Sequence, residues 1–365
     1  MNICVDCFER TEVKHSGYYS FTPPTPNLAQ RRRHFAHCDF SSSSVNLIPT
    51  RRDAASPRSG DGRPRRLINA HSLRLVDFCE DEAIPSYAIL SHRWVEGEEV
   101  TFDEFRNPKE ATKRKQGYTK IREACAEACD YGLDYIWIDT CCINKGDQGE
   151  VARNIKSMYA YYENAYICFA YLADVEGYED FELSSWFRRG WTLQELLAPR
   201  TVMFFTRGWI LMGCKHGSRS AAISRATSIS EDVLQGKRSI VDVDFLEKMS
   251  WTMGRKTTKP PDQAYCLLGM LGVSMEPDYN ETVMKAFRRL QKILVKSNPR
   301  YAKTFSRYIN LYMMVKIEPV RLSILAWMRK TGRWIAKMSF YLISITICII
   351  PMIGFWTVRC IWRQI

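Results

Sequence analysis

The sequence predicts an α/β protein whose core is a parallel β-sheet covered by helices on both faces. From Ser86 onward, short apolar runs of strand length alternate with segments whose apolar residues recur at helical spacing. Strands that alternate with helices of this length are typical of parallel sheets buried on both sides. With 365 residues, 46% of them hydrophobic, the chain can build a sizeable core and permits two domains.

Four apolar runs are the predicted strands. In chain order they are YAIL (87–90), DYIWID (134–139), YICFAYL (166–172) and TVMFF (201–205). The first two intervening helices are expected over residues 118–131 and 150–163, each with an apolar stripe on one face. The segment WFRRGWTLQELL (186–197) should begin a third helix. The α/β domain is therefore expected to span residues 73–215.

A helical extension is expected over residues 216–300, packed on the sheet. Residues 240–249, 262–272 and 281–297 have helical character, and the last of these carries a basic outer face. A basic face of this kind is most often simply solvated.

The basic charge lies at the two ends of the chain. The formal net charge is +12, with eleven Lys and Arg against six acids in residues 1–72 and eleven against one in residues 300–365. The expected core is therefore mildly acidic, which argues against nucleic acid as a partner. Residues 1–72 contain no signal peptide, and their Arg-rich and Ser-rich composition predicts a disordered basic segment. A transit peptide is the alternative, which Asp6, Glu9 and Glu12 disfavour.

The C-terminal tail predicts a membrane anchor. Residues 340–358 carry no charge, and as a helix they would span roughly 28 Å, close to the thickness of a bilayer core. The basic juxtamembrane segment 301–339 is more strongly charged than the short basic tail 359–365, so the large domain should face the cytosol. A buried core helix is the alternative, which Pro351 and Gly354 disfavour.

The thirteen cysteines are scattered, and many lie in apolar runs. They indicate buried, reduced thiols rather than a disulfide framework. Cys4 and Cys7 have metal-like spacing, but the residues that follow fit no common zinc pattern. We therefore predict no metal site.

Polar residues follow three of the predicted strands. Ser91, His92 and Trp94 come after the first strand, Asp139 comes after the second, and Asp174 comes after the third. The carboxyl ends of parallel strands meet at one edge of a sheet, where such sheets bind their ligands. These side chains are therefore expected to converge.

The segment 186–197 contributes a carboxylate among aromatic residues. It combines Trp186 and Trp191 with Arg188, Arg189 and Glu195. A carboxylate between buried aromatics and cations is a setting in which a pKa is tuned for a task. The alternative is an amphipathic surface helix on which Glu195 is solvated.

Three long motifs resemble the signature blocks of fungal heterokaryon-incompatibility (HET) domains. They are YAILSHRW, the run from GLDYIWIDTCCINKGDQ to YICFAYLADV, and WFRRGWTLQELLAP. Residues 249–273 resemble the region that follows these blocks, whereas SMEPDYNE (274–281) and Asn144 depart from the family pattern. The resemblance extends over residues 87–297. It implies a role in fungal non-self recognition that ends in programmed cell death, with protein partners from that pathway.

HET domains are in turn similar to Toll/interleukin-1 receptor (TIR) domains, which are flavodoxin-like sheets. Some TIR domains cleave the glycosidic bond of NAD, and WTLQEL resembles the stretch that carries their catalytic glutamate. The resemblance therefore implies Glu195 as the catalytic residue and NAD as a substrate, with no cofactor. The candidate ligand-binding residues are then Ser91, His92, Trp94, Asp139 and Trp191.

The sequence leaves three functions open and does not decide whether the protein is an enzyme. The first is an NAD glycohydrolase. The second is a non-catalytic, self-associating death-signalling module whose local concentration is raised by a membrane anchor. The third is a thiol enzyme using Cys141 or Cys142 with His92, for which structural cysteines are the alternative explanation. A zinc site built from the same three residues lacks a fourth ligand.

Overall fold

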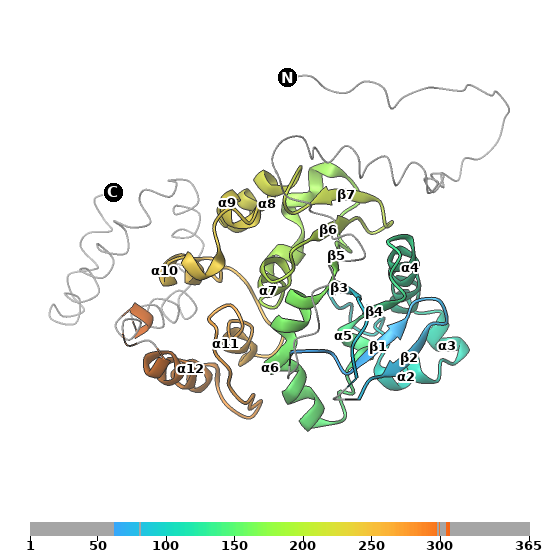
Figure 1. The fold of residues 1–365 in the computed structure, drawn as a ribbon, viewed down its shortest axis with the longest axis horizontal. Helices are drawn as coiled ribbons and strands as arrows, with labels where there is room; N and C mark the ends of the chain where they lie inside the picture. The colour runs from blue at the N-terminus through green and yellow to red at the C-terminus, as the bar shows by residue number, and fades with distance from the viewer. Residues whose placement is uncertain (1–61, 80–81, 298, 300–303, 307–365) are drawn as a thin grey trace, which may run out of the picture. The chain divides into compact units, whose positions relative to one another are not determined.

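The computed structural model describes residues 62–79, 82–297, 299 and 304–306 (Figure 1). The expectations for residues 1–61, for most of 301–339, and for 340–358 and 359–365 therefore lie outside the described residues. Within the described ranges, no helix is both long enough and apolar enough to cross a bilayer.

A seven-stranded sheet forms the centre of the fold, in the order β2-β1-β4-β3-β5-β6-β7. The strands are β1 (Arg66–Asn69), β2 (Arg74–Asp77), β3 (Ala88–His92), β4 (Tyr135–Trp137), β5 (Ile167–Tyr171), β6 (Val202–Phe205) and β7 (Leu211–Cys214). The middle strands β4, β3, β5 and β6 run parallel. When these four are numbered by their place in the chain, their order across the sheet is 2-1-3-4, as in flavodoxin-like sheets. The α/β class and the four predicted strands are thus confirmed.

The prediction of a wholly parallel sheet was wrong at both edges. β1 pairs antiparallel with β2 and β4, and β7 pairs antiparallel with β6. β1 lies within the segment 1–72 that the composition marked as disordered. It is ordered because Leu67 and Ile68 are fully buried and Ile68 pairs with Ile136 of β4. Apolar burial against a distant strand outweighs the polar composition of the surrounding chain.

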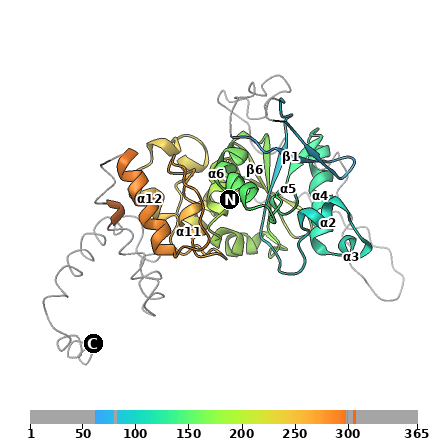
Figure 2. The ribbon, with the colours of Figure 1, turned by 90° about the horizontal axis from the view of Figure 1, so that it is seen from below.

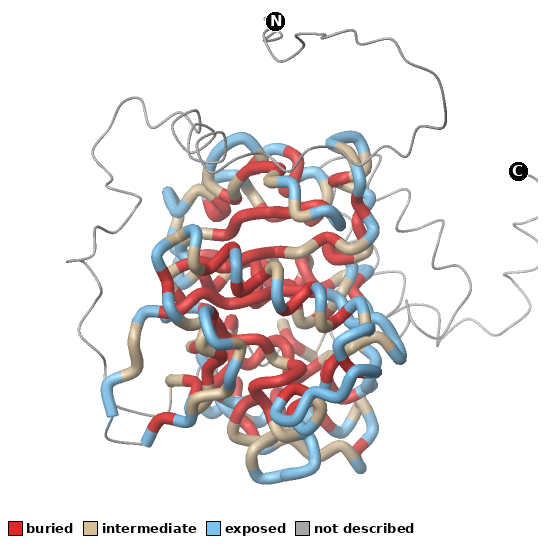
Figure 3. Tube along the Cα trace, turned by 90° about the vertical axis from the view of Figure 1, so that its right-hand side faces the viewer, coloured by how far each residue is buried: buried red, intermediate tan, exposed pale blue. Residues whose placement is uncertain are grey.

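Helices cover both faces of the parallel strands, as expected. α4 (Gln116–Asp130) lies on one face, whereas α6 (Gln148–Asn164) and α7 (Thr192–Leu197) lie on the other (Figures 1 and 2). The buried residues gather in the strands and in the segments that face them (Figure 3). The shorter helices of this part are α2 (Phe102–Arg106), α3 (Glu110–Lys113) and α5 (Asp139–Cys142).

The helical extension lies on the α6 side of the sheet (Figure 2). Its helices are α8 (Ser220–Thr227), α9 (Glu231–Leu234), η3 (Ile240–Asp242), α10 (Phe245–Ser250), α11 (Asp262–Tyr265) and α12 (Val283–Ser297). The helix expected over 262–272 is shorter than predicted, because α11 ends at Tyr265 and turns follow. Phe305 packs on Phe245 and Phe287, with ring centroids 5.6 and 6.4 Å away, so this core continues past residue 300.

The segment 186–197 is not the single helix start that the sequence predicted. A 3₁₀ turn, η2 (Ser185–Arg188), precedes α7, and the chain between them is extended at Arg189. Lys256, which belongs to the helical extension, causes this break. Its amide donates to the Arg188 carbonyl at 2.7 Å, and its carbonyl accepts from the Gly190 amide at 2.8 Å. Backbone groups that a continuous helix would use internally are therefore taken by the extension.

Candidate functional site

β3 brings two polar side chains to the carboxyl edge of the sheet. It is flanked by the parallel strands β4 and β5, and the strand order reverses around it. Such a reversal is the point at which open α/β sheets bind ligands. Ser91 and His92 form the end of β3, and both are buried.

Ser91 links β3 to Glu195 of α7. Its hydroxyl donates to the Glu195 carboxylate, and the indole N–H of Trp186 donates to the Ser91 oxygen at 2.8 Å. Glu195 is 7% exposed, and Trp186 is fully enclosed. The predicted burial of Glu195 among aromatic side chains is therefore present, and its alternative, a solvated surface glutamate, is excluded.

The environment of Glu195 changes its acidity. Burial raises the pKa of Glu195 to about 7, with Asp139 adding to the rise, while Arg189, the Ser91 hydrogen bond and Arg255 oppose it. The effect of desolvation on this pKa exceeds that of the two arginines, because both act from a distance and neither forms an ion pair with the Glu195 carboxylate. A carboxyl group with a pKa near the ambient pH is suited to general acid–base chemistry.

A second group forms around Asp139, which begins α5 directly after β4. His92 Nε2 lies 2.9 Å from one Asp139 oxygen, and the Trp94 indole N–H donates to both oxygens at 3.3 and 3.1 Å. The Lys145 ammonium lies 3.6 Å from the centre of the Trp94 ring. Burial opposes ionisation of Asp139, but the His92 hydrogen bond and the charges of His92, Lys145 and Arg189 lower its pKa to about 2.

The surroundings of His92 disfavour its charged form. Burial, and then the charge of Lys120, lower the pKa of His92. Because the Asp139 carboxylate only accepts hydrogen bonds, the neutral ring carries its proton on Nε2. Its Nδ1 lies 3.8 Å from Glu99, whose other oxygen accepts from Lys120 Nζ at 2.6 Å. This Nδ1 atom has no hydrogen-bond partner among the described residues.

Arg189 connects the two groups. Its guanidinium donates to the His92 carbonyl at 2.9 Å and lies 5.8 Å from the Trp94 ring. It also acts electrostatically on both Glu195 and Asp139. Arg189 is therefore the cation that the two carboxylates share.

The helical extension holds the segment that carries Glu195. The buried Arg255 guanidinium donates to the Arg189 carbonyl at 2.9 Å and to the Thr192 hydroxyl at 3.1 Å. The Trp191 indole N–H donates to Asp262 of α11 at 3.0 Å. Together with the backbone bridge at Lys256, these contacts determine where α7 lies relative to β3.

Most of the candidate residues meet, in two adjoining groups. Ser91 contacts Glu195, and His92 and Trp94 contact Asp139, whereas Trp191 contacts the extension. The sequence prediction missed Glu99, Lys120 and Lys145, and it gave no site role to Trp186 or Arg189. The last two could have been found, because they lie in the same motif as Glu195. No sequence signal pointed to Glu99 or Lys120, since their contact depends on how a loop folds onto α4.

The structure does not support a thiol site at Cys141 and Cys142. Both are buried, and both interact with the Ile138 backbone. Cys141 Sγ donates to the Ile138 carbonyl at 3.8 Å, and the Ile138 amide donates to Cys142 Sγ at 3.4 Å. Burial raises the pKa of Cys141 far above its usual range, and His92 Nε2 is occupied by Asp139. Within the described ranges, no three His, Cys, Asp or Glu side chains are placed so that together they could hold a metal ion.

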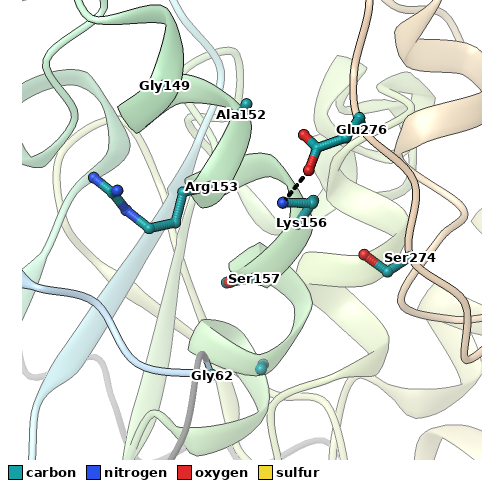
Figure 4. Close-up of a pocket in the computed structure, with 9 residues that line it drawn as sticks. Gly62, Gly149, Ala152, Arg153, Lys156, Ser157, Ser274 and Glu276 are labelled. Carbon is teal, nitrogen blue, oxygen red and sulfur yellow. Dashed lines mark hydrogen bonds and ion pairs between the residues drawn. The ribbon is translucent and has the colours of Figure 1, made fainter. Parts of the chain in front are cut away.

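A separate hollow of about 590 Å³ lies along α6 (Figure 4). Its described lining residues are Gly62, Gly149, Ala152, Arg153, Lys156, Ser157, Ala160, Ser274 and Glu276. Lys156 and Glu276 form an ion pair across it, and Arg153 points away from this pair. None of the candidate site residues belongs to this lining.

Asp139→Asn is expected to destabilise the fold at neutral pH. The depressed pKa of Asp139 means that its ionised form stabilises the fold above pH 3.8, and that this contribution is lost as the pH falls through 2. The shift corresponds to about 2 kcal/mol. Urea unfolding at pH 7 should show this loss for Asp139→Asn and none for Glu96→Gln, an exposed carboxylate in the loop that follows β3. Equal stability of Asp139→Asn and wild type at pH 7 would contradict the assigned contacts.

Comparison with known families agrees with these features. Residues 87–181 match the family model described as heterokaryon incompatibility protein (HET), a range that includes Ser91, His92, Trp94 and Asp139. Over this range the chain therefore resembles HET-domain proteins of the heterokaryon-incompatibility type.

A named relative is the vegetative incompatibility protein HET-E-1 of Podospora anserina, which is 36% identical over 227 residues. The aligned region covers 59% of this chain, but the chain spans only 16% of that relative. No solved structure matches the chain significantly.

Proposed function

We propose that this HET domain cleaves the bond between nicotinamide and ribose in NAD, and that the loss of NAD triggers cell death in fungal non-self recognition. The observation that carries the proposal is the carboxyl group of Glu195. It is buried beside the carboxyl end of β3, and its pKa is about 7. The resemblance of WTLQEL to the TIR stretch with the catalytic glutamate, and the flavodoxin-like strand order, give further support.

The chemistry requires one well-positioned carboxylate. When the C1′–N bond breaks, its electron pair leaves with nicotinamide, and positive charge develops on the ribose as an oxocarbenium ion. An ionised Glu195 stabilises that charge. Water then adds to C1′ and gives up a proton, which Glu195 accepts. Neither a metal ion nor a thiol nucleophile takes part in this reaction.

The neighbouring group around Asp139 fits the rest of the substrate. Trp94 is 41% exposed, and an indole ring is suited to stacking on a planar base. Lys145 and Arg189 carry positive charge beside that ring and suit the two phosphates of a dinucleotide. In this proposal Ser91, His92 and Asp139 orient the site, whereas Trp191 acts indirectly through its contact with Asp262.

The test is the release of products by the purified full chain. We expect nicotinamide and ADP-ribose to appear in equal amounts from NAD, at a rate proportional to protein concentration. Heat-unfolded protein is the blank. A folded preparation that releases neither product above this blank, over a range of pH around 7, would contradict the proposal.

A second candidate function is a non-catalytic death-signalling module that acts by self-association. One observation favours it: the Glu195 carboxylate is almost fully enclosed and already has an internal partner in Ser91. A structural glutamate would show the same contacts. Cells that express Glu195→Ala separate the two candidates, because death without NAD consumption supports signalling by assembly, whereas survival of the cells with protein at wild-type levels supports catalysis.

We also propose that residues 340–358 anchor the chain in a membrane, with the HET domain on the cytosolic side. The uncharged 19-residue run and its basic flanks support this topology. The full chain should stay in the membrane pellet after extraction at alkaline pH, and a version that ends at residue 339 should move to the supernatant. Extraction of the full chain under these conditions would contradict anchoring.

A further inference from the structure

A thiol, an imidazole and a carboxylate meet at the opposite edge of the sheet from Glu195. Cys129 lies near the C-terminal end of α4, His71 in the turn between β1 and β2, and Asp134 directly before β4. Cys129 Sγ lies 3.6 Å from His71 Nδ1, and His71 Nε2 lies 2.9 Å from Asp134 Oδ1. None of the three takes part in the proposed NAD chemistry.

The direction of both hydrogen bonds follows from the chemistry of the groups. The Asp134 carboxylate can only accept, so His71 Nε2 donates to it. When the ring carries this one proton, its other nitrogen, Nδ1, is the acceptor for the S–H of Cys129. A nucleophile next to a base that is oriented by a third group is the arrangement by which proteins activate thiols and hydroxyls.

The backbone holds this arrangement in place. β1 pairs with β4 so that Asn69 lies opposite Tyr135, and the Ala70 amide donates to the Asp134 carbonyl at 2.8 Å. The turn that carries His71 is closed by a bond from the Leu73 amide to the Asn69 carbonyl at 2.9 Å. The approach of His71 to Asp134 is therefore a consequence of strand register.

The thiol is not reactive without its neighbour. Burial, and then the carboxylates of Asp130 and Asp134, raise the pKa of Cys129. An isolated thiol in these surroundings would stay protonated and react slowly. Any enhanced reactivity must therefore come from the transfer of its proton to His71.

We propose that Cys129 is a modification site at which His71 and Asp134 activate the thiol toward small disulfides. The proton of Cys129 passes to His71 Nδ1, and the sulfur attacks one sulfur of the disulfide. The S–S bond breaks, and the leaving sulfur takes the electron pair and then the proton from His71. The products are a mixed disulfide on Cys129 and one free small thiol.

The open position of the triad suits such a co-reactant. The side chains of His71 and Asp134 are 61% and 66% exposed, so a small solute reaches the imidazole directly from solvent. The triad lies about 16 Å along β4 from Asp139, at 3.3 Å per residue. This inference therefore stands independently of the NAD proposal.

The test is the reaction of the native full chain with oxidised glutathione, followed cysteine by cysteine with mass spectrometry. Cys79 is the internal reference, because its side chain is exposed and forms no contact with an imidazole in the described part of the chain. We expect Cys129 to react roughly 10²-fold faster than Cys79, the lower end of what a positioned base contributes, although it is less exposed. A rate at Cys129 no higher than at Cys79 would overturn the proposal.

Variants separate activation by His71 from mere accessibility. His71→Asn should lower the rate at Cys129 roughly 10²-fold and leave the rate at Cys79 unchanged. The fully buried Cys168 reports folding, since it should remain unmodified in every native variant. If His71→Asn exposes Cys168, Asp134→Asn replaces it in the comparison. An unchanged rate at Cys129 in a folded variant would contradict activation by the triad.

Discussion

Glu195→Gln is expected to lower the rate of NAD cleavage by about 10²–10⁴, the usual effect of removing a positioned acid or base. Glutamine has the same shape, and its oxygen still accepts the hydrogen bond from Ser91, so the site keeps its geometry. What is lost is the negative charge that stabilises the ribose cation. Glu163→Gln, an exposed glutamate near the end of α6, is the matched control and should retain full activity. Nicotinamide release measured for all three proteins at pH 7 checks this expectation.

The same substitution should stabilise the fold above neutral pH. The pKa of Glu195 rises from an ordinary 4.5 to about 7 on folding. A raised pKa means that the protonated carboxyl favours folding, so this stability is fully present below pH 4.5 and is lost as the pH rises through 7. The loss is about 3 kcal/mol, at about 1.4 kcal/mol per pKa unit. Glutamine does not ionise and avoids this loss.

Urea unfolding at pH 8 and pH 4 separates the two effects of Glu195→Gln. The variant should be more stable than wild type at pH 8, and nearly equal to it at pH 4. A gain in stability together with a loss of activity is the pattern expected where a functional group is buried at a cost to the fold. An active variant would remove Glu195 from the mechanism, whereas equal stability at pH 8 would contradict its raised pKa.

Gly269→Ala is expected to cost about 3 kcal/mol, at the upper end of what overpacking does in a well-packed protein. A β-carbon at this position would lie 2.1 Å from Tyr159 Cβ and 2.2 Å from Tyr159 Cγ. Tyr159 belongs to α6, and its Cβ cannot rotate away from the backbone. The extension must therefore move off α6. Because the extension also holds α7 through Arg255 and Asp262, NAD cleavage should fall as well.

Gly149→Ala provides the matched control, since it makes the same change on α6. A β-carbon there would lie 3.3 Å from Asp147 Oδ1, the N-cap oxygen of α6, which need shift by only a few tenths of an ångström. Alanine is favoured over glycine inside a helix by about 1 kcal/mol, so this variant should be unchanged or slightly stabilised. Thermal unfolding of both variants gives the comparison. A Gly269→Ala protein as stable as Gly149→Ala would contradict the docking of the extension on the sheet domain.

The central strands and the long helices could be predicted from sequence because each has a local signal. The buried parallel strands β3 to β6 are continuous apolar runs, and α4 and α6 have clear apolar stripes. β1 (RLIN) and β2 (RLVD) have only two successive apolar residues each, and β7 (LMGC) is interrupted by Gly213, so none has the continuous apolar run of the predicted strands. The break between η2 and α7 was missed because it depends on a contact with Lys256, which is distant in sequence.

The candidate site was partly predictable because topology alone brings strand ends together. The meeting of His92 with Asp139 follows from the adjacency of β3 and β4. The contact of Trp191 with Asp262, by contrast, depends on the docking of a separate block of helices. The Cys129–His71–Asp134 arrangement depends on the register of β1, a strand that composition gave no reason to expect.

The most direct test of the central claim is a titration of Glu195 in the folded protein. The claim is that burial beside Ser91 and Trp186 keeps this carboxyl half-protonated at neutral pH, ready for glycosidic chemistry. The carboxyl band present in wild type and absent in Glu195→Gln can be followed by infrared difference spectroscopy across the pH range. We expect a midpoint near pH 7. A midpoint near 4.5, the ordinary value for a solvated glutamate, would contradict the claim.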